Sequence, residues 1–478
     1  MISPDAGSSF DAGPVDAGWG SAVDGGPSYT GPTTPGTVTV TRATKMSPLG
    51  PGFAGFSFEK GHLATGFFTG TNAPLIALFN LLGPGVIRIG ANDVDTHTWN
   101  PTAMPVPGGS MPPSQIGTAD VDQLDAFLTA TGWKVIYGVN LKAMMTAPSV
   151  AEAQYVTSKI GTKLLAFEIG NEISFYTTPQ AWATFATAIH AALPNAPLAG
   201  PGDYGSANLA VSFAQAEGSQ LTMLTHHYYR ASATSGNATM ANLLAIDPAV
   251  ASDSRTISGA VSANHIRDGF RWGEMNSYSS HGAAGVSNAF GSALWSIDFM
   301  LNTAQYGSAG VNFHGGGEWM DNNPCPNGPT SCTRPFRYSP IDEASGQVTA
   351  AAPLYYGMLF VSHAGTGTML ATTATAGNLN FSAYSILQSD GSTNVALVNK
   401  DTTNGVNASI DVGAPVTSAS AMYLQAPSLT ATSGVTFAGA GVTPAGVWNQ
   451  SPPYSLSKNG NVVTVVVPPA SAALVHAQ

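Results

Sequence analysis

Ala166-Phe-Glu-Ile-Gly-Asn-Glu-Ile-Ser174 is the stretch of sequence that decides the fold. Two leucines extend its apolar start, so a short buried strand is predicted over residues 164–169, with polar residues directly after it. A helix is predicted next, because Thr178 is a suitable N-cap and Pro179 suits the first helical position. A strand followed directly by a helix is the unit from which parallel sheets are built.

The same strand-and-helix unit recurs along most of the chain. Further strands are predicted over 86–90, 134–141, 221–229 and 310–315 and in the run that contains Glu274, and further helices over 74–83, 120–131 and 287–303. Repeated units of this kind indicate a parallel sheet that closes on itself. The predicted fold class is therefore α/β, with a (β/α)8 TIM barrel over residues 49–365.

Polar side chains lie just past the ends of the predicted strands. They are Asn92, Asn140, Asn171, Glu172, His226, His227, Tyr228, Glu274 and His314. The carboxyl ends of all strands meet at one face of a parallel barrel, so these side chains are expected to line one site. Glu172 and Glu274 matter most, because acid/base and nucleophilic chemistry at an acetal carbon requires two carboxylates. Their matching positions make a purely structural role for both the weaker alternative.

The chain changes character after the predicted barrel. Short runs rich in Val, Thr and Ala, separated by Gly, Asn and Ser, predict antiparallel strands. These runs are 394–399, 419–424 and 461–467. They indicate a β-sandwich domain over residues 366–478. A similar run over 37–41 is expected to join the same sheet, so residues 36–48 are assigned to a sandwich that is discontinuous in sequence.

The first 35 residues have a different composition. Asp-Ala-Gly and Asp-Gly-Gly triplets recur among Pro, Ser and Thr, and the first basic residue is Arg42. Such a segment buries too little apolar surface to offset its ordering entropy, so residues 1–35 are predicted to be a disordered acidic tether. No signal peptide is recognisable before it, and this abrupt start suggests a missing leader. A secreted or cell-surface tethered protein is therefore expected.

Charge and composition exclude several classes of function. The 16 basic and 27 acidic residues give a formal net charge of -11, which argues against a nucleic-acid partner. No apolar stretch approaches the length of a membrane span. Cys325 and Cys332 are predicted to form a small disulfide, with two unpaired thiols as the alternative. No further Cys or His stands at zinc-ligand spacing, and the pattern implies neither a metal nor a cofactor.

Several motifs resemble those of glycoside hydrolase family 79, the β-glucuronidase and heparanase group. Besides the Asn171-Glu172 pair, they are Gly55-Phe-Ser-Phe-Glu-Lys60, Gly83-Pro-Gly-Val-Ile-Arg-Ile-Gly90, Thr225-His-His-Tyr-Tyr229, and Glu274-Met-Asn-Ser277 with Gly285-Val-Ser287. The resemblance covers about residues 37–478. It implies a retaining enzyme of the large (β/α)8 clan, with a β-sandwich built from both ends of the chain.

The resemblance also implies catalytic roles. Glu172 would be the general acid/base, with Asn171 binding the sugar 2-hydroxyl, and Glu274 would be the nucleophile. Tyr228 would donate a hydrogen bond to that nucleophile, and His226 would be a supporting group nearby. Because successive residues of a strand face opposite sides, at most one of His226 and its neighbour His227 can point into the barrel.

Further residues would bind the sugar. Glu59 resembles a sugar-binding carboxylate, although an ion pair with Lys60 is the alternative, and Asn92 has equal claims to a binding and a structural role. In the family's glucuronidases a tyrosine shortly after the nucleophile helps to hold the sugar carboxylate. Ser279 stands at that position here, and Tyr278 lies one residue away.

A second tyrosine of the family's pattern is retained as Tyr338, and Arg337 beside it is a further candidate for attracting a carboxylate. The resulting prediction is a retaining exo-β-glycosidase, most plausibly a β-glucuronidase, whose partner is a β-glycoside or glucuronide substrate. The Ser279 departure leaves a neutral β-glycoside as the first alternative. A non-catalytic carbohydrate-binding protein is the second, and the sequence is silent on oligomeric state.

Overall fold

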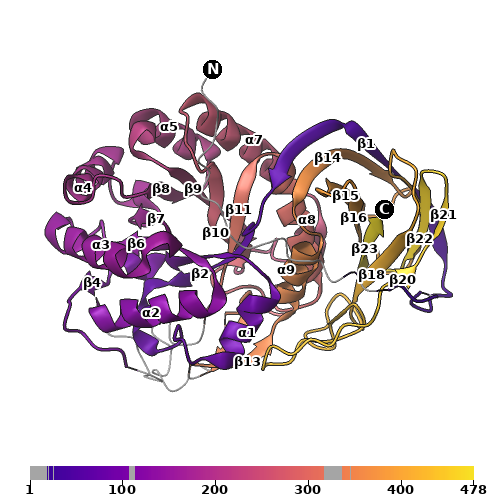
Figure 1. The fold of residues 1–478 in the computed structure, drawn as a ribbon, viewed down its shortest axis with the longest axis horizontal. Helices are drawn as coiled ribbons and strands as arrows, with labels where there is room; N and C mark the ends of the chain where they lie inside the picture. The colour runs from indigo at the N-terminus through magenta and orange to yellow at the C-terminus, as the bar shows by residue number, and fades with distance from the viewer. Residues whose placement is uncertain (1–18, 20, 25, 107–113, 317–335, 345) are drawn as a thin grey trace.

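The computed structural model describes residues 19, 21–24, 26–106, 114–316, 336–344 and 346–478. Within these residues the chain forms an α/β barrel and a β-rich domain that lie side by side (Figure 1). Helices α8 (Gly291–Gln305) and α9 (Pro353–His363) stand between the two. The predicted Cys325–Cys332 pair lies outside the described residues.

Eight parallel strands close the barrel in the order β10-β11-β2-β3-β6-β7-β8-β9, which confirms the predicted fold class. They are β2 (Ala54–Glu59), β3 (Val86–Gly90), β6 (Lys134–Val139), β7 (Leu164–Ile169), β8 (Leu198–Tyr204), β9 (Met223–Ser232), β10 (Phe270–Ser279) and β11 (Ser308–His314). Strand β8 was not predicted. Its two glycines and one proline argue against a strand in isolation, and only its neighbours β7 and β9 supply the pairing.

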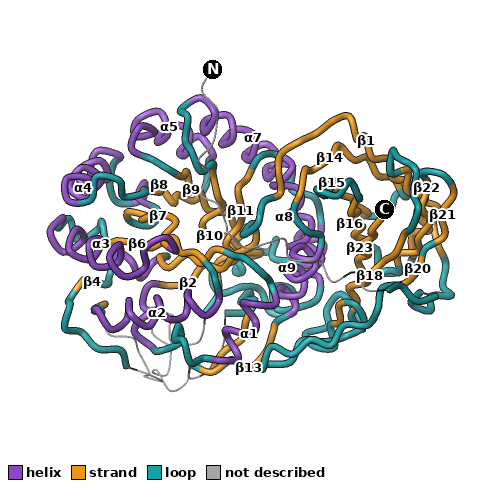
Figure 2. The backbone as a smooth tube through the Cα atoms, in the orientation of Figure 1, coloured by secondary structure: helices purple, strands orange, loops and turns teal. Residues whose placement is uncertain are grey.

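Helices surround the barrel strands (Figure 2). In addition to α8 and α9 they are α1 (Ala73–Leu81), α2 (Thr118–Thr131), α3 (Thr146–Ile160), α4 (Pro179–Ala192), α5 (Ala207–Glu217), α6 (Met240–Leu244) and α7 (Pro248–Ala263). Helix α4 begins at Pro179 as predicted, although the Thr178 side chain makes no capping hydrogen bond. No helix among the described residues is long and apolar enough to cross a membrane.

Short elements connect these units at the rims of the barrel. They are the 3-10 helices η1 (Lys60–Thr65), η2 (Asn92–Asp95), η3 (Gly161–Lys163), η4 (Ile173–Phe175) and η5 (Gly218–Gln220), and the strands β4 (Thr98–Trp99), β5 (Gln115–Ile116), β12 (Ile341–Ala344) and β13 (Gln347–Ala351). Helices η2 and η4 directly follow β3 and β7. They therefore carry the residues that leave the carboxyl ends of those strands.

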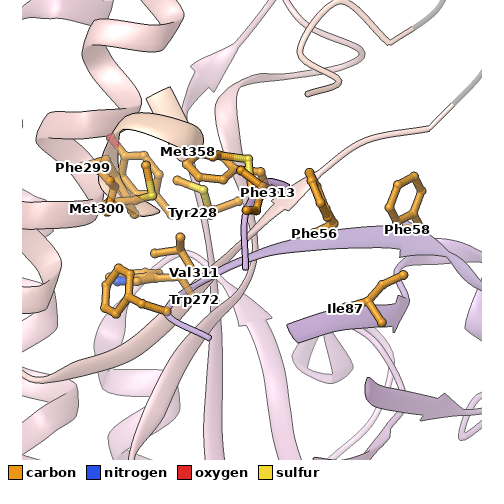
Figure 3. Packing of buried hydrophobic residues seen from close by; sticks show 14 of the residues in the cluster. Phe56, Phe58, Ile87, Tyr228, Trp272, Phe299, Met300, Val311, Phe313 and Met358 are labelled. Carbon is orange, nitrogen blue, oxygen red and sulfur yellow. The ribbon is translucent and has the colours of Figure 1, made fainter. Parts of the chain in front are cut away.

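Aromatic residues fill the layer between the barrel strands and the outer helices. Trp272 on β10 lies 5.9 Å from Phe299 on α8, and Tyr228 on β9 lies 4.9 Å from Phe299, measured between ring centroids (Figure 3). All three side chains are buried. Tyr228 therefore belongs to the hydrophobic core between the barrel strands and the outer helices, and its side chain does not face the barrel interior.

The β-rich domain contains strands from both ends of the chain, as predicted. Its eleven strands hydrogen-bond in the order β19-β18-β23-β16-β15-β14-β1-β17-β22-β21, with β20 paired to β18. They are β1 (Thr33–Leu49), β14 (Gly367–Thr375), β15 (Phe381–Leu387), β16 (Thr393–Asn399), β17 (Gly405–Asp411), β18 (Ala419–Gln425), β19 (Thr436–Phe437), β20 (Tyr454–Ser455), β21 (Ser457–Asn459), β22 (Val462–Val467) and β23 (Ser471–Ala477). Strand β1 pairs antiparallel with β14 and parallel with β17, so the N-terminal segment completes this sheet.

Part of the predicted disordered tether is ordered against this sheet. The Trp19 ring stacks on His476 at 4.9 Å, and the Val23 amide donates a hydrogen bond to the Pro453 carbonyl at 2.9 Å. The Tyr29 hydroxyl accepts a hydrogen bond from the amide of Gly405. The prediction of disorder is therefore wrong for the described residues of this segment. A few large side chains anchor it, although its average composition is polar and rich in glycine.

Candidate active site

Glu274 lies in the middle of β10 and is held by two hydrogen bonds. Arg88 Nη1 donates to Glu274 Oε2 at 2.9 Å, and the Tyr229 hydroxyl donates to Glu274 Oε1 at 2.9 Å. Burial by itself raises the pKa of this carboxyl, but the attraction of two neighbouring histidines and of Arg88 outweighs burial and lowers the pKa to about 2. Glu274 is therefore an ionised carboxylate with a fixed orientation, as a nucleophile must be.

Arg88 organises this part of the site from β3. Its side chain is fully buried and donates hydrogen bonds to Glu168 Oε2 at 2.5 Å, to Asn171 Oδ1 at 2.8 Å and to Glu274. Arg88 lies in one of the sequence motifs, but no role was predicted for it. A single arginine inside an apolar strand is the signal that could have found it, because a buried guanidinium requires several acceptors.

Glu172 lies in a different environment from Glu274. It directly follows Asn171 after β7, in a left-handed backbone conformation with φ 47°, and its amide donates to the Gly202 carbonyl at 2.8 Å. The side chain is 22% exposed, and its Oε1 lies 3.1 Å from His227 Nδ1. A carboxyl that is open to solvent on one side and contacts an imidazole on the other suits proton transfer to a substrate.

Asn171 and Asn92 lie together, as their positions at strand ends predicted. Because Arg88 occupies Asn171 Oδ1, the Asn171 Nδ2 group is turned outward, and it lies 3.4 Å from Asn92 Oδ1. Asn92 is exposed at the start of η2. The Asn171 amide is thus pre-oriented with its donor toward the open side of the site.

The predicted roles of His226 and Tyr228 are wrong by one residue. The Tyr228 hydroxyl donates to Asp247 at 2.9 Å on the outside of the barrel, and His226 Nε2 contacts the Gly205 carbonyl. Their neighbours Tyr229 and His227 face the interior instead and contact the two glutamates. The expectation that only one of the two histidines faces the interior was right. The sequence has two His and two Tyr in succession, so the facing of the strand could not be read from residue type.

A matched pair of variants tests this register. Tyr229→Phe is expected to lower kcat/KM about 10-fold or more, because it removes a hydrogen bond to a charged group worth ~1.5–3 kcal/mol. Tyr228→Phe is expected to change kcat/KM less than about 3-fold and to lower stability by ~1 kcal/mol, through the lost bond to Asp247. Steady-state kinetics and urea unfolding of both proteins check the assignment. The reverse ranking of the two activities would contradict it.

Glu59 is a second buried carboxyl close to the nucleophile position. Its Oε2 accepts a hydrogen bond from the Asp93 amide at 2.7 Å, and its Oε1 lies 3.7 Å from His314 Nε2. Burial, then repulsion by Asp93 and Glu274, raises its pKa well above the ordinary value. The neighbouring Lys60 pairs with Glu152 at 2.7 Å, so the alternative of a Glu59–Lys60 ion pair is excluded.

Burial also lowers the pKa of His314 to about 4, and the ring is therefore neutral near pH 7. At that pH Arg88 is the permanent cation beside Glu274, and the attraction of His314 acts only under acidic conditions. The surroundings of Glu59 and Glu274 thus shift the pKa values of the two carboxyls in opposite directions. Such divergence between neighbouring carboxyls is typical of catalytic sites.

The residues predicted to bind a sugar carboxylate are not all in the site. The Tyr278 side chain is fully buried, and its hydroxyl donates to the Thr239 carbonyl at 2.8 Å, so its predicted role is wrong. Two backbone carbonyls before α6 already occupy this hydroxyl. Tyr338 does reach the site, with its ring 6.1 Å from Tyr229 and 5.9 Å from His314. Ser279 is the half-buried last residue of β10.

No group of three or more His, Cys, Asp or Glu side chains in the described part of the chain could hold a metal ion. A parallel (β/α)8 barrel with an ionised buried carboxylate on β10 and a more exposed carboxyl after β7 defines a glycoside hydrolase.

Comparisons with known proteins agree with this class. Residues 383–474 match the family model described as glycosyl hydrolase family 79 C-terminal beta domain. The predicted resemblance is thereby confirmed in the C-terminal domain, and the protein is a glycoside hydrolase. No curated protein sequence matches the chain.

Solved structures share the whole architecture. A 4-O-α-L-rhamnosyl-β-D-glucuronidase from Fusarium oxysporum 12S is similar with a TM-score of 0.72 and 22% identity, over 93% of this chain and 99% of that chain. An α-L-arabinofuranosidase from Thermotoga maritima has a TM-score of 0.66 and 11% identity, over 92% and 99%. The family 51 α-L-arabinofuranosidase AbfB from Bifidobacterium longum has a TM-score of 0.65 and 14% identity, over 93% of this chain and 100% of that chain. At these identities the likeness shows the fold alone.

Proposed function

We propose that the protein is a retaining exo-β-glycosidase that acts on β-glucuronides. The observation that carries this proposal is the contrast between the two carboxyls. Glu274 is clamped by Arg88 and Tyr229 and stays ionised, whereas the Glu172 side chain is partly open and lies beside His227. Two carboxyls with divergent environments divide the roles of nucleophile and general acid/base between them.

The reaction follows from these environments. Glu172 protonates the departing glycosidic oxygen while Glu274 attacks the anomeric carbon from the opposite face, which gives a covalent glycosyl-enzyme. Glu172, now ionised, then removes a proton from water, and that water attacks the anomeric carbon and releases Glu274. Asn171 is oriented by Arg88 to donate to the sugar 2-hydroxyl, a contact that strengthens in the transition state.

The choice of a glucuronide rests on three supports. The solved structure with 22% identity is a glucuronidase by its description, and Tyr338 occupies a position beside Tyr229 in the site. Arg337 lies between β11 and β12 and contacts the loop that follows the nucleophile strand, where its amide donates to the His281 carbonyl and its Nη1 to the Gly282 carbonyl. A guanidinium beside this loop would attract the carboxylate of a uronic acid.

Ser279 favours a second candidate, a β-glycosidase for a neutral sugar. A serine in place of the expected tyrosine removes one donor to the sugar carboxylate, and Tyr278 does not replace it because its hydroxyl is engaged elsewhere. A neutral hexoside or pentoside needs no such donor. Tyr338 and Arg337 alone would then have to account for any preference for a uronate.

A panel of 4-nitrophenyl β-glycosides decides between the two. The glucuronide is expected to have the highest kcat/KM, at least about 10-fold above the glucoside, xyloside and galactoside, since a charge-assisted hydrogen bond is worth ~1.5–3 kcal/mol. Arg337→Gln is expected to lower activity on the glucuronide and leave the glucoside rate unchanged. Preference for a neutral sugar would support the second candidate. Turnover of no glycoside would leave only a binding protein and overturn the proposal.

A further inference from the structure

Glu168 is a buried carboxylate that the proposed mechanism does not use. It lies on β7 within the barrel and is fully buried. Its Oε2 accepts the hydrogen bond from Arg88, whereas its Oε1 has no hydrogen-bond partner among the described residues. A buried carboxylate oxygen without a partner is costly. If Glu168 served only to hold Arg88, a contact of the guanidinium with both carboxylate oxygens of Glu168 would bind it more strongly.

His227 carries a second unpaired buried atom. Its Nδ1 contacts Glu172, while its Nε2 is buried without a hydrogen-bond partner in the described part of the chain. The hydrogen bond made by one ring nitrogen of a histidine fixes which nitrogen carries the proton. The partner of Nε2 therefore determines how His227 Nδ1 presents itself to Glu172.

The two unpaired atoms both lie beside Gly202 on β8. A Cβ atom placed on Gly202 would lie 3.1 Å from Glu168 Oε1 and 3.4 Å from His227 Nε2. The distance between Glu168 Oε1 and His227 Nε2 therefore cannot exceed the sum of these two distances. One water molecule can bridge two atoms that far apart with hydrogen bonds of about 2.8–3.2 Å. A Cβ on Gly273 of β10 would lie 3.5 Å from the same Glu168 oxygen. Glycine at both positions adds no side chain to the space beside these atoms.

We propose that Glu168 is a positioning residue for the acid/base Glu172 and acts through His227. One buried water accepts the Nε2 proton of His227 in a hydrogen bond and donates its own hydrogen to Glu168 Oε1. His227 is thereby held as the tautomer protonated on Nε2, with the Nδ1 lone pair directed at Glu172 Oε1.

This arrangement places a single proton between the two groups. Nδ1 accepts a hydrogen bond from the protonated Glu172, which holds the carboxylic acid in one orientation until its proton passes to the departing oxygen. The proton that Glu172 later takes from water restores the same hydrogen bond. The inference rests on the proposed function, because it requires Glu172 to be the acid of the first step.

Glu168→Gln is the sharpest test, because the amide is isosteric with the carboxylate. Its oxygen can still accept from Arg88, while its NH2 group faces the gap as a donor where an acceptor is needed. The readout compares phenyl and 2,4-dinitrophenyl glycosides of the sugar preferred in the panel. Only the phenyl leaving group requires protonation. The variant is expected to lose kcat/KM on the phenyl glycoside at least about 10-fold more than on the dinitrophenyl glycoside.

Ser57→Ala is the matched control. The Ser57 hydroxyl accepts from Arg88 Nη1 at 3.2 Å and lies 3.3 Å from His314 Nδ1, and it makes no hydrogen bond to His227 within the described part of the chain. This variant therefore disturbs the arginine without touching the proposed link. It is expected to lower activity on both substrates by the same factor. Equal losses in Glu168→Gln would assign Glu168 to the arginine network alone and overturn the inference, as would an unchanged phenyl glycoside rate.

A double-variant cycle with His227→Gln provides a second test. If Glu168 acts through His227, Glu168→Gln causes little further loss on the phenyl glycoside in the His227→Gln background. Fully additive losses would contradict the link. Should Glu168→Gln fail to fold by circular dichroism, Glu168→Asp replaces it, because the shorter carboxylate withdraws from the gap. A wild-type protein that hydrolyses neither glycoside would overturn the proposed function, whereas an active wild type with equal losses overturns only this inference.

Discussion

Glu274→Gln is expected to lower kcat/KM by about 10⁴-fold or more on every glycoside, because the amide cannot replace the carboxylate in forming the covalent intermediate. Two donors hold the Glu274 carboxylate in place, and it remains ionised. The loss should be equally large on phenyl and dinitrophenyl glycosides. A better leaving group does not compensate for a missing nucleophile.

Azide identifies the role of the missing group. In Glu274→Ala, azide is expected to enter from the face that the carboxylate occupied, and an α-glycosyl azide should form from an activated β-glycoside. Glu217→Gln is the matched control, because Glu217 is also 6% exposed but lies on α5 outside the barrel. It should retain the wild-type rate within about 3-fold. A β-glycosyl azide from Glu274→Ala would mean that Glu274 is not the nucleophile.

The low pKa of Glu274 also has a consequence for stability. Its folded value of about 2 lies below the ordinary value of 4.5, so the folded state favours the ionised form. The stabilisation is present above about pH 4.5 and is lost as the pH falls toward 2. The difference in melting temperature between the wild type and Glu274→Gln should therefore be larger at pH 6 than at pH 3. A constant difference would mean that the clamp does not depend on charge.

The fold could be predicted because its signals are local and repeated. Each apolar run followed by a predicted helix indicated one unit of a parallel barrel, and the closed order of strands agrees. Strand β8 was not predicted, because Gly200, Pro201 and Gly202 disfavour a strand when the segment is considered alone. The function of Gly202 becomes visible only in three dimensions, where it leaves room between Glu168 and His227.

The two carboxyls of the site could be predicted from the sequence, but the register of β9 could not. Glu172 and Glu274 are single glutamates at strand ends, whereas His226, His227, Tyr228 and Tyr229 form two identical pairs. A shift of one residue exchanges the two faces of a strand, and the local sequence offers no apolar alternation to fix it. The pairing of β9 with β10 decides which of these residues face inward, and this pairing contains a register shift between Trp272 and Glu274.

Glu172→Ala is expected to give a loss that depends on the leaving group, unlike Glu274→Gln. A phenyl glycoside needs protonation as it leaves, so its kcat/KM should fall by about 10²–10⁴-fold. A dinitrophenyl glycoside leaves without a proton, so its kcat/KM should change little. Its kcat should nevertheless fall, because the covalent intermediate then awaits a base to activate water, and KM should fall with it.

Azide separates the two glutamates completely. In Glu172→Ala the intermediate on Glu274 forms normally, and azide needs no general base to attack it. The anion should therefore restore kcat on the dinitrophenyl glycoside and yield a β-glycosyl azide, the opposite anomer from that expected with Glu274→Ala. The structure supports this division, because Glu172 is the more exposed carboxyl and lies where a small anion can replace its side chain. Equal losses on both substrates with no azide product would remove Glu172 from the acid/base role.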